Sequence, residues 1–179
     1  YNPVKRLGET ERITEQKYVE DLEKNGCIEP SNSEWMGRLL YVPKKNTTEL
    51  RVVQDLRYVN QMTEVERYPL PRIEQILDAA ANHNLFSTLD LKAAFWQIML
   101  DQNSRDITAF GTSLGQYRWI RMPMGLTGAS SKWQQTINHT LRNILGRGAI
   151  AYVDDVLIYT KSFEHMVAMI NRVIDLCRD

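Results

Sequence analysis

The sequence has few cysteines and no long apolar runs. Its 179 residues include only two cysteines, Cys27 and Cys177, which lie far apart. With three scattered histidines they offer no zinc-ligand spacing, so free thiols in a reducing compartment are expected. No apolar run approaches 18 residues and no signal peptide precedes the first charges. We therefore expect neither a membrane-spanning helix nor a secretory leader.

An excess of charge of either sign is also missing. Lys and Arg total 22 and Asp and Glu total 22, so there is no global basic signature for nucleic acid. Residues 38–72 nevertheless hold a local excess of three positive charges. This stretch is a candidate surface for an anionic ligand, and a solvated face explains it equally well. The length and the 43% hydrophobic content fit one large domain or two small ones.

Short strands and helices mix along the chain without a regular βαβα alternation, which predicts an α+β fold. The expected helices cover residues 14–24 with Thr14 as N-cap, 71–82, 130–145 capped by Ser130 or Ser131, and a last helix from Ser162. In the last helix we expect five apolar residues to point inward: Met166, Met169, Ile170, Val173 and Ile174. The expected strands cover residues 38–42, 50–53, 86–89, 107–110 and 116–121.

The most informative tetrapeptide is Tyr152-Val153-Asp154-Asp155. It separates two apolar runs rich in β-branched or aromatic residues, so it is expected at the tip of a hairpin. Two adjacent aspartates repel each other unless a cation neutralises them, and a divalent metal prefers such hard oxygen ligands. An exposed turn is the alternative explanation.

Asp90 is the candidate third carboxylate. It ends an apolar strand and precedes the hairpin aspartates by 64 residues. A three-carboxylate site can hold two divalent cations for phosphoryl transfer. A helix N-cap or turn role for Asp90 alone remains open.

Five motifs follow one another in the order typical of one family. They are Val42-Pro43-Lys44-Lys45 with the segment 51–60, Tyr68-Pro69-Leu70-Pro71, the segment 86–98 around Asp90, the segment 122–130, and Tyr152-Val153-Asp154-Asp155. In this set the chain resembles the fingers and palm of a reverse transcriptase, closest to the gypsy-type LTR-retrotransposon branch and more distantly to the retroviral enzymes. The resemblance implies a right-hand polymerase fold: an antiparallel sheet backed by helices, with the thumb absent.

The resemblance also implies the metal chemistry. Asp90, Asp154 and Asp155 would be catalytic, and with Leu91 they would bind two Mg²⁺ ions, with Mn²⁺ as an alternative. The implied activity is RNA-directed DNA synthesis, in which a primer 3′-hydroxyl attacks a dNTP on an RNA or DNA template.

Six residues are implied as the dNTP site: Lys44, Arg51, Ala94, Phe95, Met124 and Gly125. Lys44 and Arg51 would hold the triphosphate, and Phe95 would exclude a 2′-hydroxyl. Met124 stands where retroviral relatives carry glutamine. From the residues alone, a core position is favoured for Phe95 and surface cations are favoured for Lys44 and Arg51, while a plain turn glycine explains Gly125 equally well. For Trp96 and Trp119, core packing is favoured over base stacking.

The resemblance sets the expected context of the chain. Residues 1–66 would belong to the fingers and residues 67–179 to the palm with interleaved fingers segments. The chain stops 24 residues after Asp155, so we expect weak or no processive synthesis from it alone. Partners would be the primed template, dNTPs and the thumb, ribonuclease H, integrase and protease parts of a Pol polyprotein, with no membrane. The implied location is intracellular, in cytoplasmic virus-like particles with entry to the nucleus.

Two other functions remain open. A domesticated remnant would only bind nucleic acid or a protein, and a carboxylate-cluster nuclease would use the same metal site.

Overall fold

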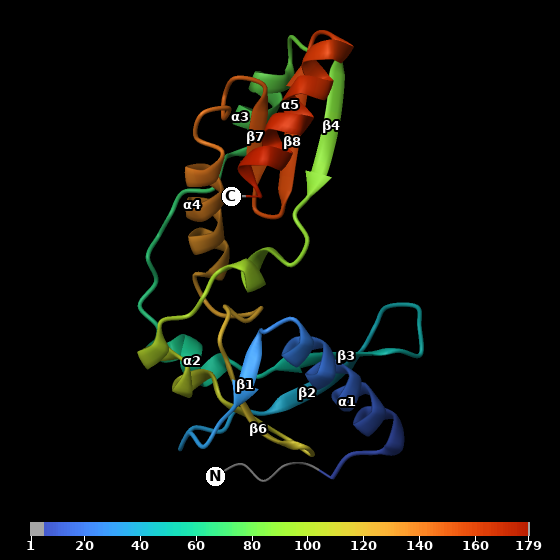
Figure 1. Ribbon diagram of the computed structural model, residues 1–179, viewed down its shortest axis with the longest axis vertical. Coiled ribbons are helices and arrows are strands. Elements are labelled where there is room, and N and C mark those ends of the chain that lie inside the picture. The colour runs from blue at the N-terminus through green and yellow to red at the C-terminus, as the bar shows by residue number, and fades with distance from the viewer. Residues whose placement is uncertain (1–5, 179) are drawn as a thin grey trace. The chain divides into compact units, whose positions relative to one another are not determined.

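The computed structural model describes residues 6–178 and forms two compact units (Figure 1). The first unit contains the chain up to Glu64 together with Phe95–Thr127. The second contains Val65–Ala94 and the chain from Gly128 onward. Each unit is described in turn.

The first unit combines one long helix with two small antiparallel sheets. Strand order is β1-β6-β5 in the three-stranded sheet, and β2 and β3 form a separate hairpin. Its helices and strands are α1 (Glu9–Lys24), β1 (Ile28–Pro30), β2 (Leu39–Pro43), β3 (Leu50–Gln54), α2 (Arg57–Met62), β5 (Phe110–Thr112) and β6 (Gly115–Trp119).

The core of the first unit forms where α1 packs onto these strands. Val19 and Leu22, three residues apart on one face of α1, are fully buried against Phe110 and Trp119. Trp119 donates its indole N–H to Oε1 of Gln54 at 2.6 Å, which satisfies the polar end of an otherwise apolar ring. This confirms the core-packing expectation for Trp119, and Trp96 packs against the same cluster.

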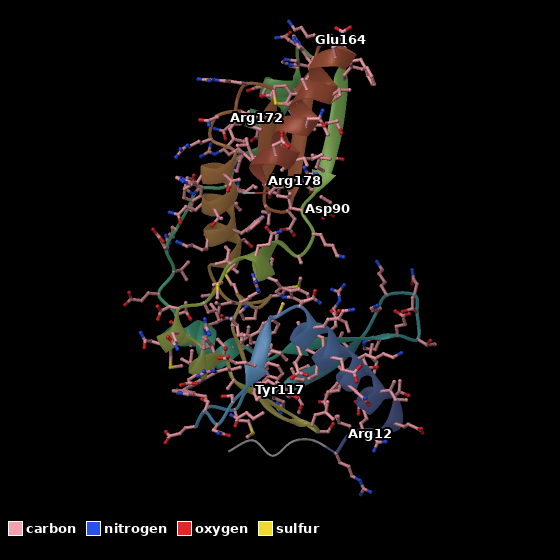
Figure 2. The ribbon with its side chains drawn as sticks, viewed as in Figure 1. Arg12, Asp90, Tyr117, Glu164, Arg172 and Arg178 are labelled. Carbon is pink, nitrogen blue, oxygen red and sulfur yellow. The ribbon has the colours of Figure 1, made fainter. Side chains whose placement is uncertain are left out.

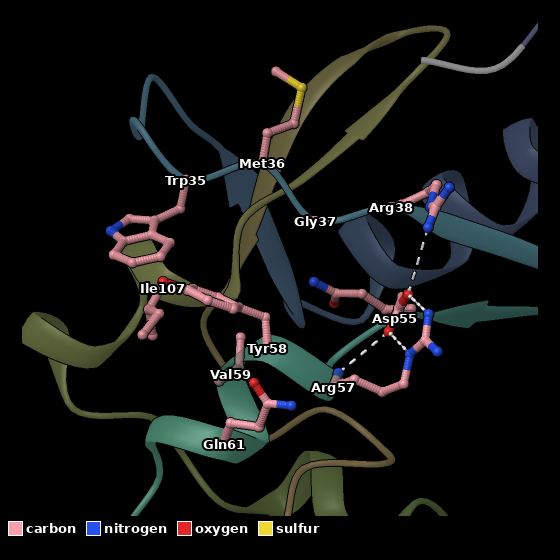
Figure 3. Close-up of a pocket in the computed structure, with 11 residues that line it drawn as sticks. Trp35, Met36, Gly37, Arg38, Asp55, Arg57, Tyr58, Val59, Gln61 and Ile107 are labelled. Carbon is pink, nitrogen blue, oxygen red and sulfur yellow. Dashed lines mark hydrogen bonds and ion pairs between the residues drawn. The ribbon is translucent and has the colours of Figure 1, made fainter. Parts of the chain in front are cut away.

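A carboxylate braces the end of the β2–β3 hairpin. Asp55 accepts two side-chain hydrogen bonds from Arg57, at 2.9 and 2.7 Å, and lies 3.8 Å from Arg38 (Figure 3). The Arg57 hydrogen bonds are the main cause that lowers the pKa of Asp55 to about 2. These residues line a cavity of about 390 Å³ together with the aromatic pair Trp35 and Tyr58.

The second unit is a three-stranded antiparallel sheet backed by helices. Strand order is β4-β8-β7, so β8 is central. Figure 1 shows α5 lying across β4 and β8. The elements are α3 (Ile73–Ala80), β4 (Leu85–Asp90), α4 (Ala129–Thr140), β7 (Ala149–Tyr152), β8 (Asp155–Thr160) and α5 (Phe163–Leu176). The mixture of helices and antiparallel strands confirms the α+β expectation.

Helix starts were predicted with mixed success. Ser162 caps α5 as expected, since its Oγ accepts a hydrogen bond from the N–H of His165 at 3.3 Å. Thr14 is not a cap, because α1 begins at Glu9 and the Thr14 hydroxyl donates to the carbonyl of Thr10 inside the helix. Ser130 and Ser131 are not caps either. Gly128 occupies that position with a left-handed φ of 80°.

Three further outcomes concern burial and chemistry. In α5, Met166 and Val173 are buried, but Ile174 is 38% exposed and was wrongly expected to point inward. Cys27 and Cys177 are both free, as expected. No helix within residues 6–178 is long and apolar enough to cross a bilayer.

Candidate active site

The sheet of the second unit places the three predicted carboxylates at one end. In the β4–β8 register Asp90 stands directly opposite Asp155, and the β7–β8 register pairs Tyr152 with Asp155. The N–H of Leu91 donates to the carbonyl of Asp154 at 2.7 Å, which ties the end of β4 to the hairpin tip. Asp90 is labelled at the end of β4 in Figure 2. Segments 64 residues apart in sequence therefore meet here.

The electrostatics of this end are unfavourable for three negative charges. Asp90 and Asp155 are exposed, whereas Asp154 is half-buried. Burial first, and then the charges of Asp90 and Asp155, raise the pKa of the Asp154 carboxyl. Its Oδ1 is one of the few buried side-chain atoms within residues 6–178 without a hydrogen-bond partner. A buried oxygen of this kind is an acceptor available to a ligand.

The turn that carries Asp154 is backbone-strained. Val153 has a φ of 49° in the two-residue loop between β7 and β8. Tight hairpins require positive φ, but they normally place Gly, Asn or Asp there. A β-branched residue in this region is an outlier that costs on the order of 1–2 kcal/mol. The surrounding structure must therefore hold the turn in place.

Helix α4 supplies the groups that hold it. Gln134, which is fully buried, accepts from the N–H of Val153 at 2.8 Å and donates to the carbonyl of Ala151 at 2.9 Å. The indole N–H of Trp133 donates to the carbonyl of Val153 at 2.8 Å. Both backbone groups of the strained residue are thus satisfied by neighbouring side chains of one helix.

A second row of contacts orients Gln134 itself. Its Nε2 also donates to Oδ1 of Asn138 at 2.9 Å, and Asn138 donates to the hydroxyl of Tyr68 at 3.0 Å. Sequence reasoning gave Trp133 and Gln134 no role. The available signal was a glutamine beside an apolar stripe formed by Ala129, Trp133 and Ile137, because buried polar groups are normally hydrogen-bonded.

The donor chemistry of this end suits a hard divalent cation. Carboxylate and carbonyl oxygens are the ligands that Mg²⁺ prefers, and Asp154 offers an unpartnered buried oxygen. Leu91 could contribute only its carbonyl, since its side chain is apolar. Within residues 6–178 no three Asp, Glu, His or Cys side chains are gathered tightly enough to hold one ion together.

Four residues of the predicted dNTP site line one pocket in the first unit. Lys44, Arg51, Met124 and Gly125 surround a cavity of about 680 Å³. That volume lies in the range of small-molecule sites. Side chains from α1 and the rings of Trp96 and Trp119 complete its walls.

The cation of Lys44 is partnered at the surface. Its Nζ donates to Oε2 of Glu49 at 2.6 Å across the β2–β3 turn. This hydrogen bond is the main cause that lowers the pKa of the Glu49 carboxyl. An exposed ion pair contributes little to stability, so an anionic ligand can readily replace Glu49.

Gly125 needs its conformation rather than its small size. Its φ is 88°, and a Cβ at this position would meet no atom within 4 Å. Asn60 clamps the surrounding turn by donating to the carbonyl of Gly125 at 2.9 Å and accepting from the N–H of Thr127 at 2.7 Å. This conformation is compatible with both interpretations of Gly125, and Asn60 is a positioning residue to which sequence reasoning assigned no role.

Ala94 and Phe95 share the short 3₁₀ helix Ala94–Gln97. Ala94 is buried and belongs to the second unit, while Phe95 is half-buried and belongs to the first. Neither is among the residues that line the 680 Å³ pocket. The pocket thus contains four of the six predicted dNTP residues.

Comparison with protein families places these features in context. The family model for reverse transcriptase (RNA-dependent DNA polymerase) matches residues 42–179. The chain is 38% identical over 169 residues to a retrovirus-related Pol polyprotein from transposon 412 of Drosophila melanogaster, covering 92% of the chain and 14% of that protein. For the transposon gypsy polyprotein of the same organism, identity is 37% over 161 residues, covering 87% and 16%.

More distant matches lead to viruses. The enzymatic polyprotein of cauliflower mosaic virus (strain Strasbourg) is 30% identical over 164 residues, covering 90% of the chain and 24% of that protein. A foamy viral protease-reverse transcriptase solved in complex with an RNA/DNA hybrid superposes with a TM-score of 0.83 at 24% identity. That match covers 98% of the chain and 23% of the solved protein, and it shows the shared fold. The chain spans less than a quarter of the length of each of these proteins.

Proposed function

Because the chain belongs to the reverse transcriptase (RNA-dependent DNA polymerase) family, we propose that it supplies the catalytic segment of an RNA-directed DNA polymerase. The reaction is attack of a primer 3′-hydroxyl on the α-phosphate of a dNTP, with release of pyrophosphate. The observation that carries the proposal is the register that sets Asp90 opposite Asp155, beside the strained turn with Asp154.

The carboxylate end of the β4–β8–β7 sheet would hold the metal. Asp90, Asp154, Asp155 and the carbonyl of Leu91 supply oxygen ligands for Mg²⁺, with Mn²⁺ as the alternative. When bound, two such ions activate the attacking hydroxyl and stabilise the leaving oxygen. The chain's own contribution is to fix the ligands, which α4 does through the hydrogen bonds of Gln134 and Trp133.

The nucleotide would bind in the first unit. Lys44 and Arg51 offer an ammonium and a guanidinium fork to the triphosphate, and both lie at the wall of the 680 Å³ pocket. Phe95 would select a deoxyribose by excluding a 2′-hydroxyl, with Ala94 beside it. Met124 would contribute an apolar contact to the incoming nucleotide, and Gly125 would form the turn next to it.

Domain roles and context follow from the same proposal. The first unit would correspond to the fingers and the second to the palm. Partners would be a primed RNA or DNA template and the remaining parts of a Pol polyprotein. We place the working enzyme inside the cell, in cytoplasmic particles with access to the nucleus.

Primer extension tests the proposal. The chain is joined to the segments that follow the matched region in the transposon 412 polyprotein and given a primed RNA template, dNTPs and Mg²⁺. We expect templated incorporation that Asp154→Asn reduces at least about a thousandfold, because a metal ligand is removed. Asp175→Asn, an exposed carboxylate change in α5, is the matched control and should leave incorporation unchanged.

Two outcomes would favour other functions. If the folded fusion binds primed template but incorporates nothing, a binding module is the better description. If it nicks supercoiled plasmid in Mg²⁺ and Asp154→Asn abolishes nicking without any incorporation, the carboxylates serve a nuclease.

A further inference from the structure

A second cavity in the chain has a strongly one-sided charge. It has a volume of about 810 Å³ and lies in the second unit, among the end of α3, the α4–β7 connection, the end of β8 and the first turns of α5. Its lining includes three permanently charged cations, Arg147, Lys161 and Arg172, and two histidines, His83 and His165. Among residues 6–178, no Asp or Glu side chain belongs to the lining.

The three cations come from three different segments. Arg147 precedes β7, Lys161 follows β8, and Arg172 lies in the second half of α5, where Figure 2 labels it. Within residues 6–178 none of the three lies within 4.0 Å of a carboxylate. All three side chains are exposed. Cations that converge without partners from separate segments create a local positive potential.

The walls of the cavity are rigidly built. Tyr159 is 3% exposed, and its ring meets the His83 ring edge-on with centroids 4.7 Å apart. Its N–H donates to the carbonyl of Gly148 at 2.9 Å. A Cβ on Gly148, whose φ is 121°, would approach the Met169 methyl to 2.9 Å. The positive φ favours glycine at this position, and the Met169 methyl, as the end of a flexible side chain, could shift to admit a Cβ.

His83 adds a group that the fold leaves without a partner. Its Nδ1 is buried and makes no hydrogen bond within residues 6–178. A buried ring nitrogen without a partner is uncommon and needs a physical account. His83 lines the cavity, so its ring lies beside the space that a ligand would fill.

We propose that this cavity binds a compact polyphosphate through Arg147, Lys161 and Arg172, with His83 and His165 as neutral or charged hydrogen-bond donors. Several phosphate groups match three converging cations better than one phosphate does, and charge-assisted hydrogen bonds to phosphate oxygens are strong. The volume suits a small molecule. The cations converge on a cavity rather than follow a long groove, which argues against a nucleic-acid strand.

The chain contains its own spectroscopic reporters for this site. Two of its three histidines line the cavity, and the third, His139, lies in the last turn of α4 outside the lining. The 179-residue chain with isotope-labelled histidine is titrated with inorganic tripolyphosphate in the absence of divalent cations. We expect saturable shifts of the His83 and His165 imidazole resonances and none for His139.

Matched variants assign the binding. Lys161→Gln with Arg172→Gln should weaken tripolyphosphate at least about tenfold, since two charged contacts are lost. Arg12→Gln with Lys24→Gln removes two exposed cations of α1 and should change the affinity less than about twofold. Lys44→Gln with Arg51→Gln should leave the histidine shifts intact, which separates this cavity from the proposed nucleotide pocket.

Three results would overturn the proposal. One is the absence of His83 and His165 shifts in the wild-type chain. Another is an equal loss of affinity in the α1 control variant. The third is a short single-stranded oligonucleotide that shifts both histidines while tripolyphosphate does not, which would make this face a nucleic-acid surface instead.

Discussion

The chain contains two hairpins that carry proposed site residues and that are stabilised in opposite ways. The β7–β8 turn is only two residues long, has a β-branched residue at positive φ, and is fixed by buried hydrogen bonds from Gln134 and Trp133. The β2–β3 turn is longer and polar, places Asn46 at positive φ, and is closed by the exposed Lys44–Glu49 pair. The difference teaches that a short strained turn depends on buried hydrogen bonds from a neighbouring helix, while a longer polar turn can be closed by an exposed ion pair that a ligand could replace.

The largest expected effect comes from breaking the buried support. Gln134→Leu removes both hydrogen bonds to the β7–β8 turn and leaves the N–H of Val153 and the carbonyl of Ala151 without partners. We expect a loss of about 2 to 4 kcal/mol in the free energy of unfolding, measured by urea denaturation. Gln135→Leu, at the next position of α4, is the control and should change it by less than about 0.5 kcal/mol. An equal loss of unfolding free energy in the Gln134→Leu and Gln135→Leu variants would show that Gln134 stabilises only the helix and not the β7–β8 turn.

Placing asparagine at position 153 and valine at position 46 tests the difference in backbone strain between the two turns. Val153→Asn should stabilise the chain by about 1 kcal/mol, because asparagine tolerates positive φ better than a β-branched residue. Asn46→Val should destabilise it by a similar amount for the converse reason. Thermal unfolding of both variants measures the pair. A destabilised Val153→Asn variant would mean that packing of the valine side chain stabilises the chain by more than the strained backbone of Val153 destabilises it.

Because the carboxylates at the β7–β8 turn repel one another, we expect that removing one of them stabilises the fold although it removes a proposed metal ligand. Asp154→Asn removes the half-buried member of a group of like charges, so the melting temperature without divalent cations should rise by a few degrees. Added Mg²⁺ should raise the melting temperature of the wild-type chain and have little effect on the variant. Asp175→Asn serves as the control. An unchanged melting temperature in wild-type chain on adding Mg²⁺ would argue against a metal at this tip.

The Asp55 brace at the end of β3 predicts a pH dependence. Its pKa in the folded chain is lowered to about 2 from an ordinary 3.8, so the unfolded chain binds more protons between those values. Stability from this carboxylate is therefore complete above about pH 4 and is lost as the pH falls toward 2. Urea unfolding across this range should show a shallower decline for Asp55→Asn than for the wild-type chain. Parallel curves would contradict the assignment.

The smallest effect concerns the exchangeable pair of the β2–β3 turn. Glu49→Gln should leave the melting temperature unchanged, because both partners are exposed. It should raise the affinity for a nucleoside triphosphate about two- to fivefold, the factor that corresponds to releasing a surface ion pair. Lys44→Gln should lower that affinity, and Lys45→Gln is the neighbouring control. Calorimetric titration of all three variants checks the order.

Local features were predictable because short segments determine them. The hairpin around Asp154 follows from two β-rich runs separated by a polar break, and Ser162 caps α5 with the side chain that the sequence offers. Thr14 and the Ser130-Ser131 pair failed for a related reason. Serine and threonine are compatible with a helix interior as well as with a cap, and the helices begin earlier, after Gly8 in an extended conformation and after Gly128 with a left-handed φ.

The family motifs, by contrast, identified candidate site residues but gave no information on which neighbouring side chains position them. Asn60 and Gln134 each form a hydrogen bond with the backbone of a turn that carries proposed site residues, Asn60 at Gly125 and Gln134 at Val153. Neither contact can be read from spacing, because each joins segments that become neighbours only when the chain folds. The same is true of the cations around the 810 Å³ cavity, which come from two connections and from helix α5.

The sequence by itself determined which reactive side chains are present: three carboxylates, a lysine and an arginine around the β2–β3 turn, and the order of motifs that identifies the family. It determined these because side-chain chemistry and local strand or helix pattern do not depend on distant contacts. Only the tertiary structure decided that Asp90 stands opposite Asp155, that α4 holds a strained valine between β7 and β8, and that Asp154 keeps an unpartnered oxygen. Those outcomes depend on register and on packing between distant segments, which no local pattern specifies.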